Sequence, residues 1–273
     1  MTDFVHLHNH SEYSLLDGLS KIKPMVNRAK ELGMSALAIT DHGNMYGTIR
    51  FYEACRAEGI KPIIGCEIYV AKRARTDKTA EDKDYNHLIL LAKNNQGYKN
   101  LMKIVSISHL EGFYYKPRVD LELLEKYHEG LICLTACLNG YVSDPLLHDQ
   151  ENEAIKRLKK LQDIFVEGNI YLELQKHLKV RGQDELNTKL IDLSKRFGVP
   201  FVATNDNHYI KRDDAEAQEI LLCIGTQTTI DTPNRKLSML GSPDFYIKSG
   251  EDMTAAFKEV PEAITNSKKI ADM

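Results

Sequence analysis

Short apolar, mostly β-branched runs recur along the chain, and their lengths and spacing predict buried strands. Polar or glycine-containing segments bound each run, as is typical of strands that are covered on both faces of a sheet. The runs occupy residues 4–8, 36–40, 61–70, 87–92, 131–136, 170–175 and 200–204.

Most intervals between these runs have the spacing of amphipathic helices. The segments IKPMVNRAKELG (22–33) and TIRFYEACRAEG (48–59) each end in glycine, which favours the left-handed backbone found after a last helical turn. The segments 152–168 and 184–198 repeat this design. The alternation predicts an α/β fold with a parallel sheet, and its length favours a closed or nearly closed barrel of seven strands. A doubly wound open sheet is the alternative.

Two segments interrupt the alternation. Residues 71–86 are polar and carry both charge signs, so we expect an exposed loop there. Residues 228–253 are rich in turn-forming residues and predict a loop or hairpin that crosses the barrel. The helix-like stretch 260–273 ends without a capping signal, so we interpret residues 1–273 as a single domain within a longer protein.

Composition narrows the class of protein. Lysine and arginine (36) nearly balance aspartate and glutamate (39), so any contact with nucleic acid has to be local. The sequence has neither a secretory signal pattern nor a long uninterrupted apolar segment. Its five cysteines form no C-x-x-C pair, which is typical of a reducing compartment. Together these features predict a cytoplasmic globular protein without a disulfide framework.

Metal-ligating residue types follow or lie within nearly every predicted strand. In HLHNH, alternation places His6, His8 and His10 on one face of an extended segment. In a barrel of this kind, chemistry gathers at the carboxyl ends of the strands. Imidazole, carboxylate and thiolate are the usual protein ligands of first-row metals. The candidates are His8, His10, Asp17, His42, Glu67, His87, Cys137, Asp206 and His208.

Each candidate alone also has a structural interpretation. A buried histidine is more often satisfied by a carbonyl, Cys137 could be a small buried apolar residue, and Asp17 could form a turn. Asp41 could orient a ligand or cap the next helix, and Glu173 is ambiguous. The sequence has no dinucleotide-binding, P-loop or G-x-S-x-G motif. The recurrence of ligand types at one end of the strands therefore favours a shared metal site.

Six segments together resemble one known family. The motifs FVHLHNHSEYSLLDG, AITDHGNMYG, GIKPIIGCEIYV, HLILLAKN, LTAC and ATNDNHY are similar, in this order, to those of the polymerase and histidinol phosphatase (PHP) domain. The sequence of the first motif resembles that of the PHP domain at the N-terminus of bacterial DNA polymerase III alpha subunits. This resemblance implies a distorted seven-stranded TIM-like barrel with two to three divalent metal ions, zinc being favoured over manganese or iron.

The resemblance also implies how the ligands are divided. His8, His10, Glu67 and Asp206 would hold one ion, Asp17, His42 and His208 a second, and His87 and Cys137 a third, with Glu67 bridging. His6 has no counterpart among the ligands, and we expect it to pack or hydrogen-bond inside the barrel.

The implied activity is a metal-dependent 3′–5′ exonuclease that proofreads the primer strand of DNA through a trinuclear site. The alternatives are a phosphomonoesterase similar to histidinol phosphatase and a non-catalytic, metal-stabilised module that braces the polymerase and docks partners. Implied partners are DNA, the remainder of the alpha subunit and other replisome subunits. Solvated charges are the simpler interpretation of the basic residues, and GFYY (112–115) could stack a base or pack. The basic candidates for contacts with the DNA backbone are Lys72, Arg73, Arg75, Lys78, Lys116 and Arg118.

Overall fold

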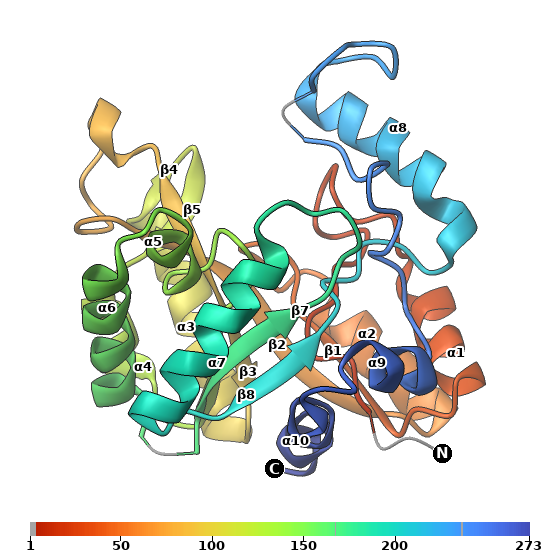
Figure 1. The fold of residues 1–273 in the computed structure, drawn as a ribbon, viewed down its shortest axis with the longest axis horizontal. Coiled ribbons are helices and arrows are strands. Elements are labelled where there is room, and N and C mark those ends of the chain that lie inside the picture. Colours follow the sequence, from red (N-terminus) through yellow and green to blue (C-terminus); the bar gives the residue numbers. More distant parts are fainter. Residues whose placement is uncertain (1–3, 167, 236) are drawn as a thin grey trace.

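A computed structural model describes residues 4–166, 168–235 and 237–273 as a mixed α/β fold with a curled, half-barrel sheet (Figure 1). Helices surround the sheet, and the described part of the chain holds no helix that is both long and apolar enough to cross a membrane. The strands are β1 (Ala36–Ile39), β2 (Lys61–Ala71), β3 (Tyr85–Ala92), β4 (Phe113–Tyr114), β5 (Lys116–Val119), β6 (Leu131–Leu134), β7 (Ile170–Gln175) and β8 (Phe201–Thr204).

The helices occupy most of the intervals that the sequence assigned to them. Left-handed glycines end two of them as expected, Gly59 (φ 73°) and Gly198 (φ 68°). The helices are α1 (Ile22–Glu31), α2 (Thr48–Glu58), α3 (Asn95–Leu110), α4 (Leu121–Tyr127), α5 (Ser143–Leu147), α6 (Glu151–Ile164), α7 (Gln183–Phe197), α8 (Ala215–Thr226), α9 (Gly250–Ala256) and α10 (Pro261–Asp272), with 3₁₀ turns η1 (Ala80–Asp82) and η2 (Arg212–Asp214).

The sheet runs β4-β5-β2-β3-β6-β7-β8, and β1 also pairs with β2. The expectation of a wholly parallel sheet is wrong, because β3 is antiparallel to both β2 and β6. The physical reason is the connection between β2 and β3. Residues 72–84 contain only the short turn η1 instead of a crossover helix, and a parallel partner requires a crossover.

Residues 4–8 were expected to form a regular strand and do not. On one side, the N–H groups of Ala38 and Thr40 in and after β1 donate to the carbonyls of His6 and Asn9. On the other side, Asn207, just after β8, donates to the His8 carbonyl and accepts from the His10 N–H. The N-terminal segment thus lies between the two ends of the curled sheet, bound to both.

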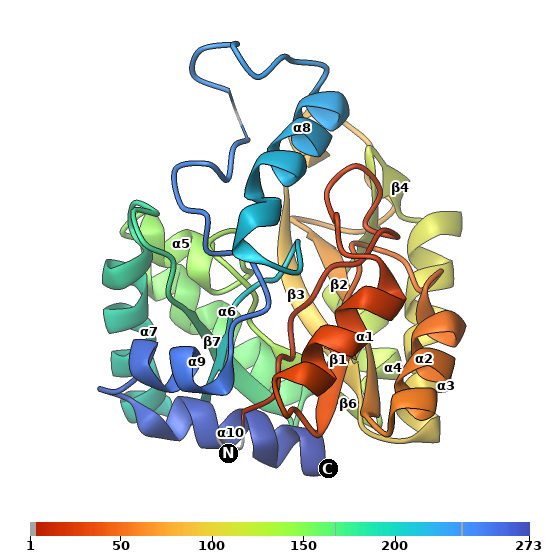
Figure 2. The same cartoon turned by 90° about the vertical axis from the view of Figure 1, so that its right-hand side faces the viewer.

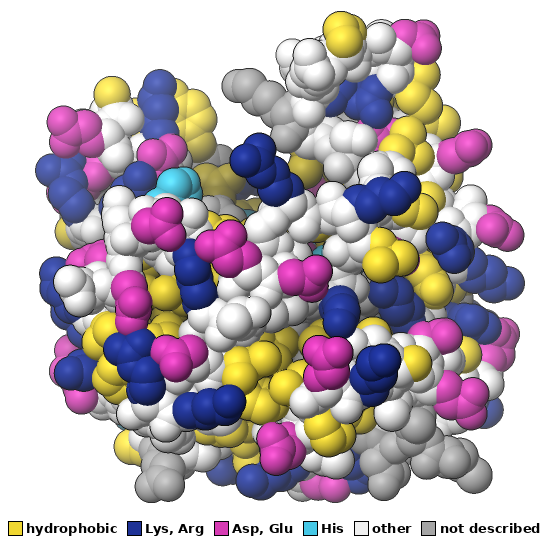
Figure 3. Space-filling model, viewed as in Figure 1, with side chains coloured by type: hydrophobic (Ala, Val, Ile, Leu, Met, Phe, Trp, Pro, Cys, Tyr) yellow, Lys and Arg dark blue, Asp and Glu magenta, His cyan; other side chains and the backbone are white. Residues whose placement is uncertain are grey.

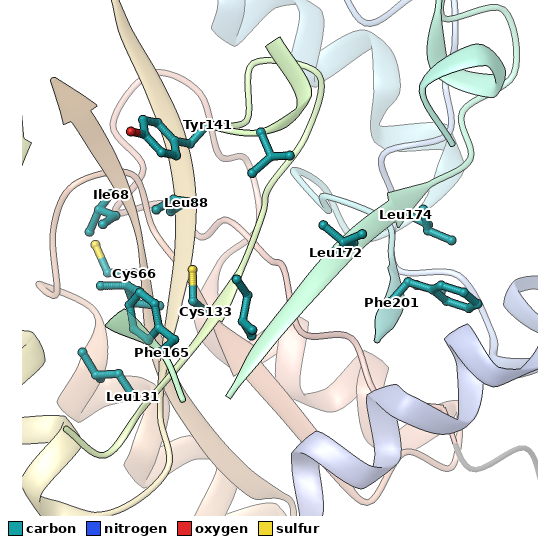
Figure 4. Close-up of a cluster of buried hydrophobic side chains, with 14 of the residues drawn as sticks. Cys66, Ile68, Leu88, Leu131, Cys133, Tyr141, Phe165, Leu172, Leu174 and Phe201 are labelled. Atoms are coloured by element: carbon teal, nitrogen blue, oxygen red, sulfur yellow. The ribbon is translucent and has the colours of Figure 1, made fainter. Parts of the chain in front are cut away.

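The core has two layers because neighbouring residues of each strand point to opposite faces. Ile89 and Leu134 belong to a cluster inside the curl, whereas Leu88 and Cys133 belong to the larger cluster between sheet and helices. Figure 4 shows part of this outer cluster around Phe165. Burial on both faces explains why the strands read as continuous apolar runs. All five cysteines are free, as expected.

The two polar segments lie at the upper rim in the view of Figure 1. The first links β2 to β3. The second, of which residues 227–235 and 237–249 are described, follows α8, which projects above β7 and β8 (Figures 1 and 2). Its expected end at residue 253 is wrong, because Ser249 caps α9, which begins at Gly250. The surface is hollowed between these two projections (Figure 3). The carboxyl ends of β7 and β8 point toward this rim, where the predicted ligands were expected.

Candidate metal centre

The N-terminal segment aims two histidines into the rim through an irregular pairing with β1. His6 and Asn9 are three positions apart, whereas their partners Ala38 and Thr40 are two apart, so the segment contains one extra residue, as in a β-bulge. The Asn9 side chain stabilises this bend by donating to the carbonyls of His6 (3.0 Å) and Ala38 (2.9 Å).

The first ligand group is buried. His8 Nε2 and His10 Nε2 lie 2.9 and 3.0 Å from the same atom, Glu67 Oε2. Both nitrogens also lie 3.1 Å from Asp206 Oδ1. Two imidazoles and two carboxylates therefore aim single atoms at one small space, which is the arrangement that a cation needs.

A second group lies beside the first. His42 Nε2 is 2.8 Å from Asp17 Oδ2, and His208 Nε2 is 3.8 Å from Asp17 Oδ1. The rings of His42 and His208 stack on His10, at centroid distances of 4.0 and 4.4 Å. The structure therefore adds His10 to the neighbours of this group.

The third group contains the thiol. Cys137 Sγ lies 3.8 Å from His87 Nδ1, and this nitrogen also contacts Glu67 Oε1. Glu67 thus touches members of all three groups, since its other oxygen contacts His8 and His10 and lies 3.5 Å from His42 Nδ1. All nine predicted residues are brought together at the rim; that they bind metal stays a prediction.

Unsatisfied buried atoms favour cations in this space. Among the described residues, Asp17 Oδ1, Glu67 Oε1 and Asp206 Oδ1 have no hydrogen-bond donor, and the two ring nitrogens of His42 have no hydrogen-bond partner. Several of the close contacts described above do not have the angles of a hydrogen bond. Buried polar atoms nearly always have a partner. These carboxylate oxygens and imidazole nitrogens are therefore suited to coordinate divalent ions such as zinc.

The electrostatics of the cluster agree with this fit. Burial alone would raise the pKa of Glu67, but His87 and His42 outweigh it and hold that pKa well below its usual range. Burial opposes the charged form of His10 too, yet Asp206 and Glu67 raise its pKa to about 9. Burial and Glu67 raise the pKa of the Cys137 thiol. Ion binding must therefore displace protons from His10 and Cys137.

Ser14, which the sequence did not single out, fixes the tautomer of His10. The Ser14 hydroxyl donates its proton to Asp41 Oδ1 (2.8 Å), so it must accept from His10 Nδ1–H (3.0 Å). The Nδ1 proton is thereby fixed, so the proton that an ion displaces from His10 is the one on Nε2, which faces Glu67. Through Ser14, Asp41 orients the His10 ring. Its other expected role, capping the next helix, is wrong, because α2 begins later, at Thr48, with Gly47 as its N-cap.

We expect Ser14→Ala to weaken metal binding about tenfold, because partners that orient metal-bound imidazoles are worth 10–100-fold in affinity. Titration with zinc against a chromophoric chelator measures this. Ser106→Ala on the exposed face of α3 is the matched control. Equal zinc affinity of Ser14→Ala and the control would contradict the role given to Ser14.

Glu173, ambiguous in sequence, plays the corresponding part for His8. Its Oε1 lies 2.7 Å from His8 Nδ1 and also accepts from Gln175 Nε2 (3.1 Å) and Thr204 Oγ1. This fixes the His8 ring so that Nε2 faces Glu67. His6 is confirmed as an interior hydrogen-bonding residue, with Nε2 2.9 Å from the Lys248 carbonyl.

The basic residues proposed to contact DNA are mostly engaged within the protein. Lys72 pairs with Asp84, Arg73 with Asp82, and Arg75 with Glu111 and Asp120. Lys116 lies over the Tyr69 ring.

For Arg118 the expectation of a DNA contact is wrong. Its side chain is fully buried and donates to the carbonyls of Gly112, Asp82, Arg75 and Asp77. The sequence suggests an exposed charge here, whereas Arg118 lies on the short strand β5 between β4 and β2, and the 72–84 segment covers it. Arg118 therefore fastens that segment to β5.

Arg118→Met is expected to lower the free energy of unfolding by about 3 kcal/mol, because several buried carbonyls lose a charged donor. Urea denaturation measures it. Lys72→Met in the same segment is the control, since Lys72 and its partner Asp84 are 44% and 74% exposed and exposed pairs contribute at most about 1 kcal/mol. Equal effects of the two variants would show that Arg118 anchors nothing.

Comparison with known proteins places this fold and site in a family. The model of the PHP domain matches residues 6–177, so the chain belongs to the PHP domain family. Its relatives include DNA polymerase III alpha subunits. It is 48% identical to that of Borreliella burgdorferi over 272 residues and 48% identical to that of Treponema pallidum over 273 residues. The match covers 98% of this chain but 23% of each relative, so the chain spans about a quarter of their length.

Solved structures agree on the fold. A protein of Bifidobacterium adolescentis, named as a candidate metal-dependent phosphoesterase, is similar with a TM-score of 0.50 at 15% identity. The match covers 75% of this chain and 87% of that one. At this identity the similarity supports the curled α/β architecture alone.

Proposed function

We propose that this chain is a metal-dependent phosphoesterase that removes nucleotides from the 3′ end of DNA, as a proofreading exonuclease within a DNA polymerase III alpha subunit. The observation that carries the proposal is the convergence of three ligand groups on Glu67 at the rim. The structural family and the polymerase relatives support the phosphoester class and the DNA context.

The proposed division of ligands follows the three groups. His8, His10, Glu67 and Asp206 hold one ion, Asp17, His42 and His208 a second, and His87, Cys137 and Glu67 a third. Bound divalent ions lower the pKa of water to about 7 and polarise phosphoryl oxygens. Within the chain, Ser14 and Glu173 keep His10 and His8 in the tautomers that this binding requires. In this proposal residues 4–10 act as the seventh strand of a distorted barrel.

The pocket at the rim fits a nucleotide in its volume and in the mixture of polar and apolar side chains that line it. Its volume is about 480 Å³, within the usual range for small-molecule sites, and Glu67 and Asp206 line it. Leu138, Val180 and Phe245 provide apolar wall surface for a sugar and base. Exposed Phe113 and Tyr115 on the β4–β5 hairpin remain candidates for stacking an unpaired base.

The test is digestion of a primer with a 3′ mismatch, resolved to single nucleotides, by protein of measured metal content. A 5′-labelled strand should give a ladder, and a variant with both His10→Ala and Asp206→Ala should give none. The exposed-surface variant Glu122→Gln is the control for purification and folding, since its side chain is 84% exposed.

Two other outcomes would replace the proposal. Release of phosphate from small phosphomonoesters, without laddering, would assign a phosphatase similar to histidinol phosphatase. Two to three bound metals without hydrolysis of either substrate would assign a metal-stabilised module that braces the polymerase.

A further inference from the structure

His177 is a buried residue of the rim pocket that none of the ligand groups uses. It lies between β7 and α7 and lines the same pocket as Glu67, Asp206 and His208. His177 is only 6% exposed.

Packing holds the ring of His177 in place. The imidazole stacks on Phe245 with ring centroids 4.0 Å apart and an interplanar angle of 18°. The next residue, Leu178, donates its N–H to Asp244 Oδ2 at 3.1 Å. Asn205, just after β8, donates to the Asp244 carbonyl at 2.8 Å and so ties this wall to the sheet.

The ring is fixed, yet its polar atoms are unused. Among the described residues, neither Nδ1 nor Nε2 of His177 has a hydrogen-bond partner. An unpaired buried polar group lowers the stability of the fold. The two free ring nitrogens of His177 therefore indicate a ligand that pairs with one of them. Burial lowers the pKa of His177 to about 4, so at neutral pH the ring is uncharged and carries one N–H donor.

We propose that His177 contacts the substrate directly, its ring N–H donating a hydrogen bond to an oxygen of the phosphoryl group that occupies the rim pocket. The inference rests on the proposed function for the class of substrate. His177 is a rigid, unpaired donor that lines the same pocket as Glu67 and Asp206, so it can face an oxygen of a phosphoryl group held there. The neighbouring Gln183 Oε1, also unpaired, accepts only and does not compete for this role.

The test uses inorganic phosphate as the probe and the metal-loaded chain as the protein. His177→Phe keeps an aromatic ring against Phe245 but has no donor. We expect it to weaken phosphate binding about tenfold or more, by calorimetry, because a hydrogen bond to a charged group is lost. Metal content and the thermal midpoint should stay at the wild-type values. In the wild type, the ¹⁵N signals of the His177 ring should shift when phosphate is added.

Phosphate affinity of His177→Phe within about twofold of wild type, or ring signals that phosphate does not move, would overturn the inference. The result is separable from the proposed function. If DNA is not degraded but phosphate still shifts the His177 signals, the exonuclease fails and the phosphoryl contact stands. If wild type and His177→Phe degrade DNA with the same KM and bind phosphate equally, the contact fails and the exonuclease stands.

Discussion

Glu67→Gln is expected to remove most bound metal and to lower phosphoester hydrolysis by at least about 100-fold, since even outer partners of metal ligands are worth up to that factor. The substitution keeps the shape of the side chain but removes its charge. Glu67 contacts His8, His10, His42 and His87, so one neutral amide would weaken all three ligand groups at once. Elemental mass spectrometry of the purified variant and its turnover number measure the two effects.

The matched control is Glu122→Gln on α4, a carboxylate that contributes to no ligand group. It should keep wild-type metal content and turnover. A Glu67→Gln protein that still carries two to three ions, with activity within a factor of a few of wild type, would show that Glu67 neither bridges nor holds the cluster.

Removal of the metals by a chelator is expected to lower the thermal midpoint by about 8 °C or more. An ion present at a thousand times its dissociation constant stabilises the folded state by about 4 kcal/mol, and each kcal/mol corresponds to about 2–4 °C in a chain of this size. The unpaired oxygens of Asp17, Glu67 and Asp206 are the groups that lose their counter-charge. Differential scanning calorimetry with and without chelator measures the shift.

Glu67→Gln provides the internal control for this experiment, because its midpoint should hardly respond to metal or to chelator. If the wild type melted at the same temperature in both conditions, the cluster would not bind ions tightly under those conditions. A similar response in the two proteins would place the stabilising ion elsewhere on the chain.

Six of the seven predicted strands were found close to their expected bounds, because burial on both faces leaves continuous apolar runs that can be read directly. The direction of β3 could not be read in this way. A loop was expected over residues 71–86, but a loop of this length can join either parallel or antiparallel strands, so it does not fix the direction of β3. The burial of Arg118 could not be predicted for a related reason: a charged residue in a short strand suggests an exposed side chain until the 72–84 segment that covers it is placed.

The recurrence of ligand residue types at one end of successive strands pointed to this region of the sequence, and the resemblance to the PHP family separated the nine candidate ligands from Asp41. The residues that orient them were harder to find. Ser14 lies in an ordinary loop, and Glu173 lies inside an apolar strand where its carboxylate gives no periodic signal. No sequence motif marks His177. It stands out only in the structure, where its ring stacks on Phe245 and makes no hydrogen bond to the described residues.

The placement of the N-terminal segment between β1 and the end of β8 has a consequence for synthesis of the chain. The first group needs His8 and Asp206, which are separated by most of the sequence, so its ligands are complete only after residue 206 has left the ribosome. Earlier in translation, His8 and His10 have only Glu67 as a partner within this group. In the site we propose, a nascent or truncated chain would therefore hold its ion more weakly, and full metal binding would require that the two ends of the sheet have met.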